Sequence, residues 1–171
     1  ATAISFGIAE GTLTNQSLIV IPVKITEAND VHSIIKVNGV DVLRTGAKEF
    51  DFEASLLLEG ENQVQVESTD IAGNVTQSLT LKIIKDSTPP VLSNIQPANN
   101  RRIDRLVFSV TGRANEKLDQ INVNGLALTL DANRVNFSGT YVAAKNGTEE
   151  LLFSATDLAG NKTEIRNTIQ I

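Results

Sequence analysis

The residues that could do chemistry in this chain are few, and they do not form a catalytic set. His32 is the only histidine, and Asp30 and Ser33 lie close to it in the sequence. A Ser–His–Asp relay needs three side chains that converge in space. On an extended segment Asp30 and His32 share one face, whereas Ser33 points away from both. Since the chain also has no cysteine to act as a nucleophile, we expect no enzymatic activity and no catalytic residues.

A repeated segment with oxygen-bearing side chains suggests calcium binding as a second kind of chemistry. Residues 70–74, Asp-Ile-Ala-Gly-Asn, return as Asp-Leu-Ala-Gly-Asn at 157–161. Calcium takes about six to eight oxygen ligands, more than the two side chains of one copy supply. An Asp at the start of a turn accepts a backbone N–H two residues on, and the glycine adopts a positive φ. We therefore expect both copies to be structural turns.

A better candidate for calcium binding lies where the two halves of the chain are expected to join. Asp86 stands at that junction, and Asp30 or Glu116, from loops at the domain ends, would combine with it. Carboxylate oxygens are ligands that calcium prefers. Calcium is the one cofactor that the sequence suggests, because it contains no phosphate loop, metal triad or glycine-rich dinucleotide turn.

Charge and hydropathy limit the classes of partner. The net charge is −5, from 6 Lys and Arg against 12 Asp and Glu in residues 1–86 and 9 against 8 in residues 87–171. Neither half has the basic stripe that nucleic-acid binding needs, and no apolar run is long enough to cross a bilayer. We therefore expect no nucleic-acid binding and no membrane insertion of this fragment. Because the chain starts at Ala1 and lacks methionine, we expect flanking domains of a longer chain.

Apolar residues at every second position predict strands along most of the chain. The odd positions of residues 19–25 and the even positions of residues 50–56 are apolar, so each set forms one inward face. Pro22 cannot donate to a ladder, so its strand should be bulged or unpaired on one side there. Asn38-Gly39 predicts a tight hairpin. About seven strands in about 85 residues indicate a β-sandwich, with a small barrel as the alternative.

The second half of the chain repeats the first. Between the halves, Pro89-Pro90 favours a short extended linker. We therefore predict an all-β protein of two tandem immunoglobulin-like antiparallel β-sandwiches, residues 1–86 and 87–171. Matched positions include Asn38-Gly39 with Asn124-Gly125, Asp30 with Glu116, and Phe50 with Phe137.

These features resemble the bacterial immunoglobulin-like (Big-type) tandem repeats of surface and secreted proteins. The resemblance rests on residues 37–39, Phe50, the Glu-Gly-Glu-Asn turn at 59–62, and residues 70–74 and 86–90. It implies an extracellular or cell-surface location. It also implies a non-catalytic role as a structural spacer, a stalk or a cell-adhesion module of a larger bacterial protein.

A recognition function is the alternative that the sequence leaves open. The resemblance extends to accessory modules of secreted polysaccharide-active enzymes, which would bind a glycan or a protein. Stacking on a sugar needs exposed aromatic rings, whereas the six Phe fall at inward positions or strand starts and Tyr141 is the only tyrosine. The expected partners are therefore flanking domains and a protein or glycan ligand that the sequence does not name.

Overall fold

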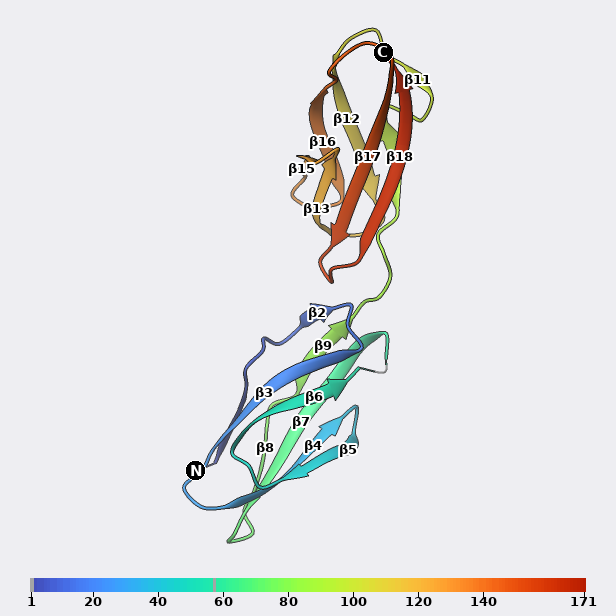
Figure 1. The fold of residues 1–171 in the computed structure, drawn as a ribbon. Helices are drawn as coiled ribbons and strands as arrows, with labels where there is room; N and C mark the ends of the chain where they lie inside the picture. Colours follow the sequence, from blue (N-terminus) through green and yellow to red (C-terminus); the bar gives the residue numbers. More distant parts are fainter. Residues whose placement is uncertain (1, 57) are drawn as a thin grey trace. The chain divides into compact units, whose positions relative to one another are not determined.

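The computed structural model describes residues 2–56 and 58–171, in which strands are joined by turns and loops without any helix (Figure 1). The chain divides into two compact units, Ala1–Ser87 and Thr88–Ile171, one residue from the boundary expected from the sequence. Each unit packs its own hydrophobic core between two sheets. The predicted pair of β-sandwiches is therefore confirmed.

The first unit has two facing sheets. Its strands are β1 (Ala3–Phe6), β2 (Thr12–Thr14), β3 (Leu18–Thr26), β4 (Val31–Val37), β5 (Val40–Thr45), β6 (Glu49–Ser55), β7 (Gly60–Asp70), β8 (Val75–Gln77) and β9 (Leu81–Lys85). One sheet has the order β1-β3-β6 and the other β2-β9-β7-β4-β5, with β8 paired to β7. The sheets are not purely antiparallel as predicted, because β2 runs parallel to β9.

The second unit repeats this arrangement. Its strands are β10 (Leu92–Gln96), β11 (Arg101–Arg102), β12 (Val107–Ala114), β13 (Leu118–Val123), β14 (Leu126–Ala127), β15 (Thr129–Leu130), β16 (Asn136–Val142), β17 (Thr148–Asp157) and β18 (Lys162–Gln170). The sheet orders are β10-β12-β16-β15 and β11-β18-β17-β13-β14. Here β11 runs parallel to β18, as β2 does to β9 in the first unit.

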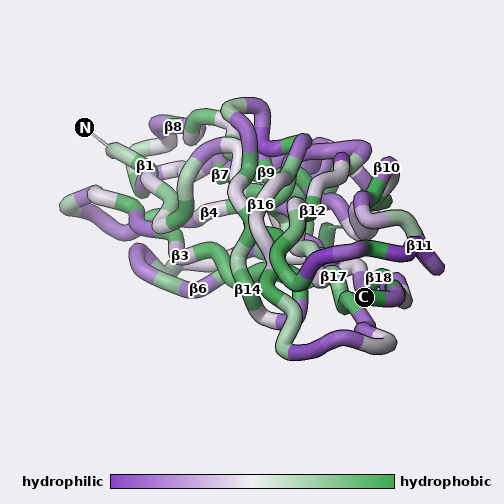
Figure 2. Tube along the Cα trace, turned by 90° about the horizontal axis from the view of Figure 1, so that it is seen from above, coloured by the Kyte–Doolittle hydropathy of each residue, from purple (hydrophilic) through white to green (hydrophobic). Residues whose placement is uncertain are grey.

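The cores follow the alternation of apolar and polar residues, which Figure 2 shows along the Cα trace. On β3, Ile21, Val23 and Ile25 are buried, while Ile19 is half-buried at the margin of the core. Pro22 lies on the opposite face. The pairing of β1 with β3 ends at Val23, and Pro22 only accepts a hydrogen bond from Gly7 N–H, at 2.8 Å. Since a proline has no N–H to give, the predicted one-sided gap is confirmed.

Both predicted Asn-Gly hairpins are present. Asn38 and Gly39 have φ values of 51° and 81°, and Asn124 and Gly125 have 48° and 81°. Two successive residues with positive φ match the twist of the flanking strands, and asparagine and glycine tolerate this conformation best. Each asparagine also binds the neighbouring long strand: Asn38 Oδ1 accepts from Gln63 N–H and Asn124 Oδ1 from Leu152 N–H, both at 2.8 Å.

The alignment of Phe50 with Phe137 is wrong in register. Phe50 lies opposite Val23, whereas Gly139 lies opposite Val110, the counterpart of Val23. Phe137 lies one rung further along, opposite Gly112. Its ring covers that glycine closely, because a Cβ added to Gly112 would collide with it. The two units thus fill the same space with rings from different positions.

Candidate functional site

The repeated Asp-x-Ala-Gly-Asn segments form two corners that are held by hydrogen bonds to their aspartates. In the first unit Asp70 Oδ1 accepts from the N–H groups of Ala72 and Asn74, both at 2.9 Å. The amide of Asn74 donates to Asp70 Oδ2 at 2.8 Å. Gly73, with φ at 86°, donates its N–H to the Asp70 carbonyl at 3.0 Å. The aspartate therefore closes the turn between β7 and β8, as the sequence predicts.

The second corner has the same bonds. Asp157 Oδ1 accepts from the N–H groups of Ala159 and Asn161, and Asp157 Oδ2 accepts from the Asn161 amide, all at 2.8 Å. Gly160 has φ at 95°. Asp157 is 2 % exposed and Asn161 8 %. Since both oxygens of each aspartate hold the turn, the predicted structural role is confirmed at both positions.

A third corner of this kind was not found in the sequence. Asp131 Oδ1 accepts from the N–H groups of Val135 and Asn136, and Asp131 Oδ2 accepts from the Asn136 amide. The spacing is one residue longer, and Arg134, with φ at 59°, takes the place of the glycine. Arg134 Nε donates to the Leu118 carbonyl at 2.7 Å, which holds the residue in this unusual conformation. In the sequence, only the Asp and the Asn that flank this turn indicate that it is a corner of the same kind.

The hydrogen bonds at these corners lower carboxyl pKa values. The Asn74 amide, followed by the Asn74 backbone N–H, holds the pKa of Asp70 below its ordinary value. The Asn136 amide and the Val135 N–H act in the same way on the pKa of Asp131. Each donor favours the ionised carboxylate over the protonated acid. Both aspartates therefore act as hydrogen-bond acceptors, the role that the corners require of them.

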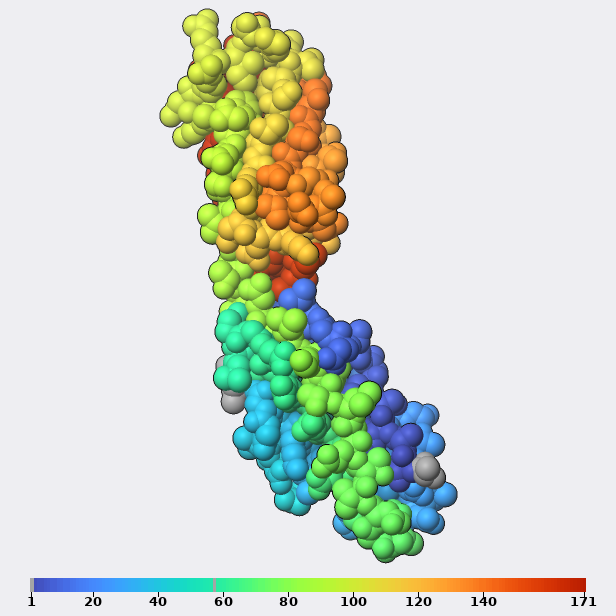
Figure 3. All heavy atoms as spheres, turned by 180° about the vertical axis from the view of Figure 1, so that it is seen from behind, coloured from blue at the N-terminus to red at the C-terminus, as the bar shows by residue number. Residues whose placement is uncertain are grey.

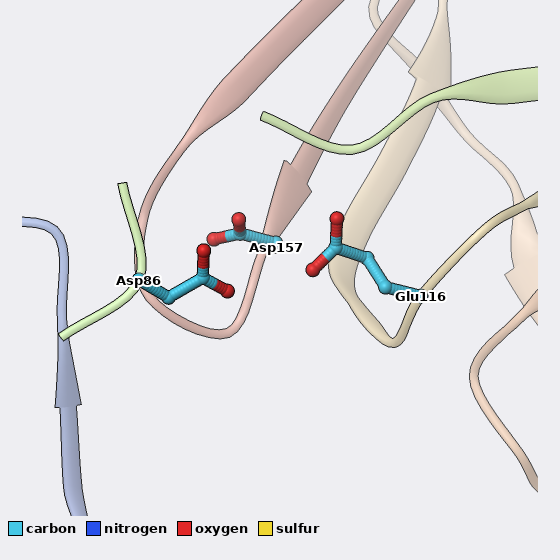
Figure 4. A group of neighbouring side chains, drawn as sticks. All are labelled: Asp86, Glu116 and Asp157. Atoms are coloured by element: carbon cyan, nitrogen blue, oxygen red, sulfur yellow. The ribbon is translucent and has the colours of Figure 1, made fainter. Parts of the chain in front are cut away.

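The second unit also brings two acidic side chains together at the end of its sheet (Figure 4). Glu116 lies on the loop that leads into β13, whose first residue, Leu118, lies opposite Asp157. A carboxylate oxygen of Glu116 lies within 4.8 Å of one of Asp157. Asp157 was expected only as a turn residue, and the register of β13 with β17 brings it beside Glu116. Two carboxylates are fewer ligands than calcium takes, and Asp157 already binds the corner.

The predicted combination of Asp86 with Asp30 is wrong. Val31 follows Asp30 and lies opposite Asp70, at one end of β7. Lys85 precedes Asp86 and lies opposite Gly60, at the other end of β7. Strand β7 has eleven residues, a length of about 33 Å at the rise of a β-strand. Asp86, labelled in Figure 4, is held at its own end by a 2.9 Å hydrogen bond from its N–H to the Thr14 carbonyl. Its combination with Glu116 stays a prediction.

The residues near the single histidine do not converge. His32 is exposed on β4, whereas Ser33 is 2 % exposed and its hydroxyl donates to Ser68 Oγ at 3.0 Å. Neighbouring residues of a strand point to opposite faces, so the Ser33 hydroxyl is directed into the sandwich. These side chains therefore form no relay.

Comparisons with known proteins define the class of fold. No family model matches this chain. It is similar to bacillopeptidase F of Bacillus subtilis (strain 168), with 28 % identity over 130 residues, which cover 73 % of this chain and 9 % of that protein. The fibronectin(III)-like modules of Clostridium thermocellum CbhA match its fold with a TM-score of 0.62 at 12 % identity, over 100 % of this chain and 94 % of theirs.

A weaker structural match is a chimeric titin Z1Z2, with a TM-score of 0.40 and 8 % identity over 99 % of this chain and 96 % of that one. The fold assignment rests on the CbhA modules and not on this match. The chain is thus a pair of modules with the immunoglobulin-like and fibronectin III-like fold. Among the described residues, no helix has the length and apolar character needed to cross a membrane.

Proposed function

We propose that this pair of modules is a non-catalytic spacer in a larger bacterial surface or secreted protein. The observation that carries the proposal is the parallel pairing of an early strand with the last strand in each unit. In the first unit Thr12, Leu13 and Thr14 lie opposite Ile83, Ile84 and Lys85. In the second, Arg101 and Arg102 lie opposite Ile169 and Gln170. Figure 3 shows the N-terminal segment of the first unit, in dark blue, beside the yellow-green segment that contains β9.

Parallel pairing decides how a unit responds to tension between its ends. Force on the two ends draws β2 and β9 past each other along their length, because the chain enters before β2 and leaves after β9. The hydrogen bonds between them are then sheared together instead of opening one by one. Gly11 N–H to the Lys82 carbonyl and Asp86 N–H to the Thr14 carbonyl, both at 2.9 Å, extend this ladder at its two ends. A spacer under load benefits from this arrangement.

Single-molecule pulling tests the proposal. With handles at both ends of the chain, we expect two separate unfolding steps, each releasing about 300 Å of chain for a unit of this size. Thr14 C=O accepts from Asp86 N–H, so the backbone groups of Thr14 face β9. Thr14→Pro removes its N–H from the ladder, so the first unit should then unfold at a lower force while the second keeps its force. Thr14→Ala, which keeps the N–H, is the matched control. An unchanged force in Thr14→Pro would exclude load-bearing by this pair.

The place of the chain in a longer protein is part of the proposal. The match to bacillopeptidase F spans 9 % of that protein, which fits a module within a larger chain. The proposal also includes a surface or secreted location, a role in adhesion and a Big-type origin of the repeats. Sequencing of the full gene tests them, since a secretion signal or an anchor would support this placement and their absence would oppose it.

Calcium binding by Asp86 and Glu116 remains a separate proposal. A ligand that binds only the folded state raises the unfolding temperature, so calcium should raise it relative to a chelator. Glu116→Gln should remove that rise, whereas Glu164→Gln, at an exposed site on β18, should keep it. Equal midpoints of the unsubstituted chain with and without calcium would contradict the proposal.

A further inference from the structure

On one side of the first unit, each of the two sheets ends in an edge strand. Strand β6 pairs with β3 alone, and β5 pairs with β4 alone, so within the described residues each presents an unpaired edge on the same side of the sandwich (Figure 1). An unpaired edge displays a row of N–H and C=O groups that can pair with another strand.

The direction of the free groups on β6 follows from its neighbours. Lys48 C=O accepts from Ile25, and Leu56 N–H donates to Ser17, so the even-numbered residues direct their backbone groups towards β3. The register between β3 and β6 runs without a bulge. Backbone groups of successive residues in a strand alternate in direction. The N–H and C=O groups of Asp51 and Glu53 therefore point to the open edge.

Beside this edge lies an apolar groove of about 330 Å³. Phe52 and Val37 form its buried part, and Val40, at 63 % exposed, and Val42, at 48 %, form its rim. Val42 is the extra residue of a bulge, since Lys36 lies opposite Asp41 and Ile35 opposite Leu43. Bulges are frequent at sheet edges and beside binding sites, where they redirect a side chain.

The second unit shows how such an edge is closed. There β14 ends at Ala127, and the chain crosses to the other sheet, where β15 pairs antiparallel with β16. Leu128 enters the sandwich at this crossing and is 8 % exposed. In the first unit β5 stays paired with β4 as far as Thr45. In the second unit β15 therefore covers the edge of β16, whereas in the first unit no described strand covers the equivalent edge of β6.

Charge separates the kinds of strand that could fill this edge. Glu49, Asp51 and Glu53 share the exposed face of β6. Lys24 pairs with Glu49 at 2.6 Å, whereas Asp51 and Glu53 form no ion pair with any residue that the structure describes. A second copy aligned edge to edge would bring its own row of carboxylates to the first, and like charges opposite one another are unfavourable. Basic side chains would complement the row.

We propose that the β6 edge of the first unit binds an extended segment of a partner protein that alternates apolar with Lys or Arg side chains. The segment adds a strand antiparallel to β6, as β15 does to β16. Its apolar side chains enter the groove between Val42 and Phe52, and its basic side chains face Asp51 and Glu53. Backbone pairing gives affinity in this mode, and the alternate side chains give specificity.

A synthetic peptide tests the proposal on the whole chain. The probe is an eight-residue peptide of alternating Val and Lys with blocked ends, and the readout is amide NMR shifts during titration. We expect shifts confined to β5 and β6, and weakening in high salt. A peptide of the same composition in the order Val-Val-Lys-Lys, which lacks the period of a strand, should bind at least tenfold more weakly. Equal binding of the two peptides would overturn the proposal.

Three variants complete the experiment. Glu53→Pro removes an N–H that faces the open edge and leaves the β3 ladder intact, so peptide affinity should fall at least tenfold. The double variant Asp51→Asn with Glu53→Gln, which keeps every backbone group, should weaken binding severalfold, whereas Glu164→Gln in the second unit should not change it. Unchanged affinity in both β6 variants, or shifts confined to other strands, would refute the site. Neither outcome bears on the unfolding forces that test the spacer role.

Discussion

At the scale of single residues, the aspartate corners show how one side chain replaces a stretch of backbone pairing. Asp70 and Asp157 each accept two backbone N–H groups and one asparagine amide. A buried or half-buried turn must satisfy its N–H groups, and a carboxylate does so with two oxygens. Calcium would have to compete with these donors at either corner.

The lowered pKa of Asp70 predicts a loss of stability in acid. Because the folded carboxyl has a lower pKa than its ordinary value of 3.8, the folded state binds fewer protons than the unfolded state. Its contribution is complete above about pH 4 and disappears as the pH falls through the folded pKa. Asp70→Asn should therefore reduce the pH dependence of the urea midpoint of the first unit below pH 4. An identical dependence in the variant and the unsubstituted chain would contradict this role.

Two substitutions of Asn38 should separate the contributions of its backbone conformation and of its side-chain hydrogen bonds to the stability of the turn. Asn38→Ala should cost roughly 1–2 kcal/mol for the left-handed backbone and about 1 kcal/mol more for the lost side-chain bonds to Gln63 and Asn62. Asn38→Gly keeps the backbone conformation available, so it should cost only the second part. Chemical unfolding of the three proteins measures both. Equal losses in the two variants would show that the side-chain bonds dominate and that the conformational argument fails.

At the scale of elements, the period of two in the sequence predicts which face of each strand is buried. Ile21, Val23, Phe52 and Ala54 lie in the core as the pattern requires. The register between strands is less visible in the sequence, because any shift by two residues keeps the same faces inward. Phe50 and Phe137 were matched for that reason, although they stand on different rungs.

The position of the Phe137 ring against Gly112 predicts the effect of a side chain at residue 112. A Cβ at this position would collide with the ring of Phe137, so Gly112→Ala should destabilise the second unit by about 1–3 kcal/mol. Gly139→Ala is the matched control, because its Cβ would meet the end of a flexible leucine side chain, Leu128 Cδ2, at 2.6 Å. We expect a smaller loss there, measured by thermal unfolding. A larger loss in Gly139→Ala would argue against the rigid ring as the cause.

At the scale of the whole molecule, two separate cores make two units of folding. The buried apolar residues form one cluster within residues 21–83 and another within residues 92–169. Pro90 and Val91 bind the second unit, since Thr163 Oγ1 donates to the Pro90 carbonyl at 2.6 Å and Val91 N–H donates to Asn115 Oδ1 at 2.7 Å. These two residues therefore belong to the second unit and do not form a free linker.

This division predicts that residues 88–171 fold alone. Expressed by themselves, they should unfold in a single cooperative transition, since a domain with its own core is a folding unit. Residues 90–171, which begin at Pro90, keep both linker bonds and are the control. Spectra without dispersed amide signals for both fragments would contradict independent folding.

The sequence alone determined the fold class, the two-fold repetition, the inward faces and the turn chemistry, because these depend on local alternation and on residues that tolerate positive φ. Tertiary structure decided what depends on long-range register. It separated Asp30 from Asp86 by the length of β7, brought Glu116 beside Asp157, and left the β6 edge open while β15 covers its counterpart. The physical reason is that pairing between strands distant in the sequence is set by the packing of the whole sandwich, which no short pattern of residues records.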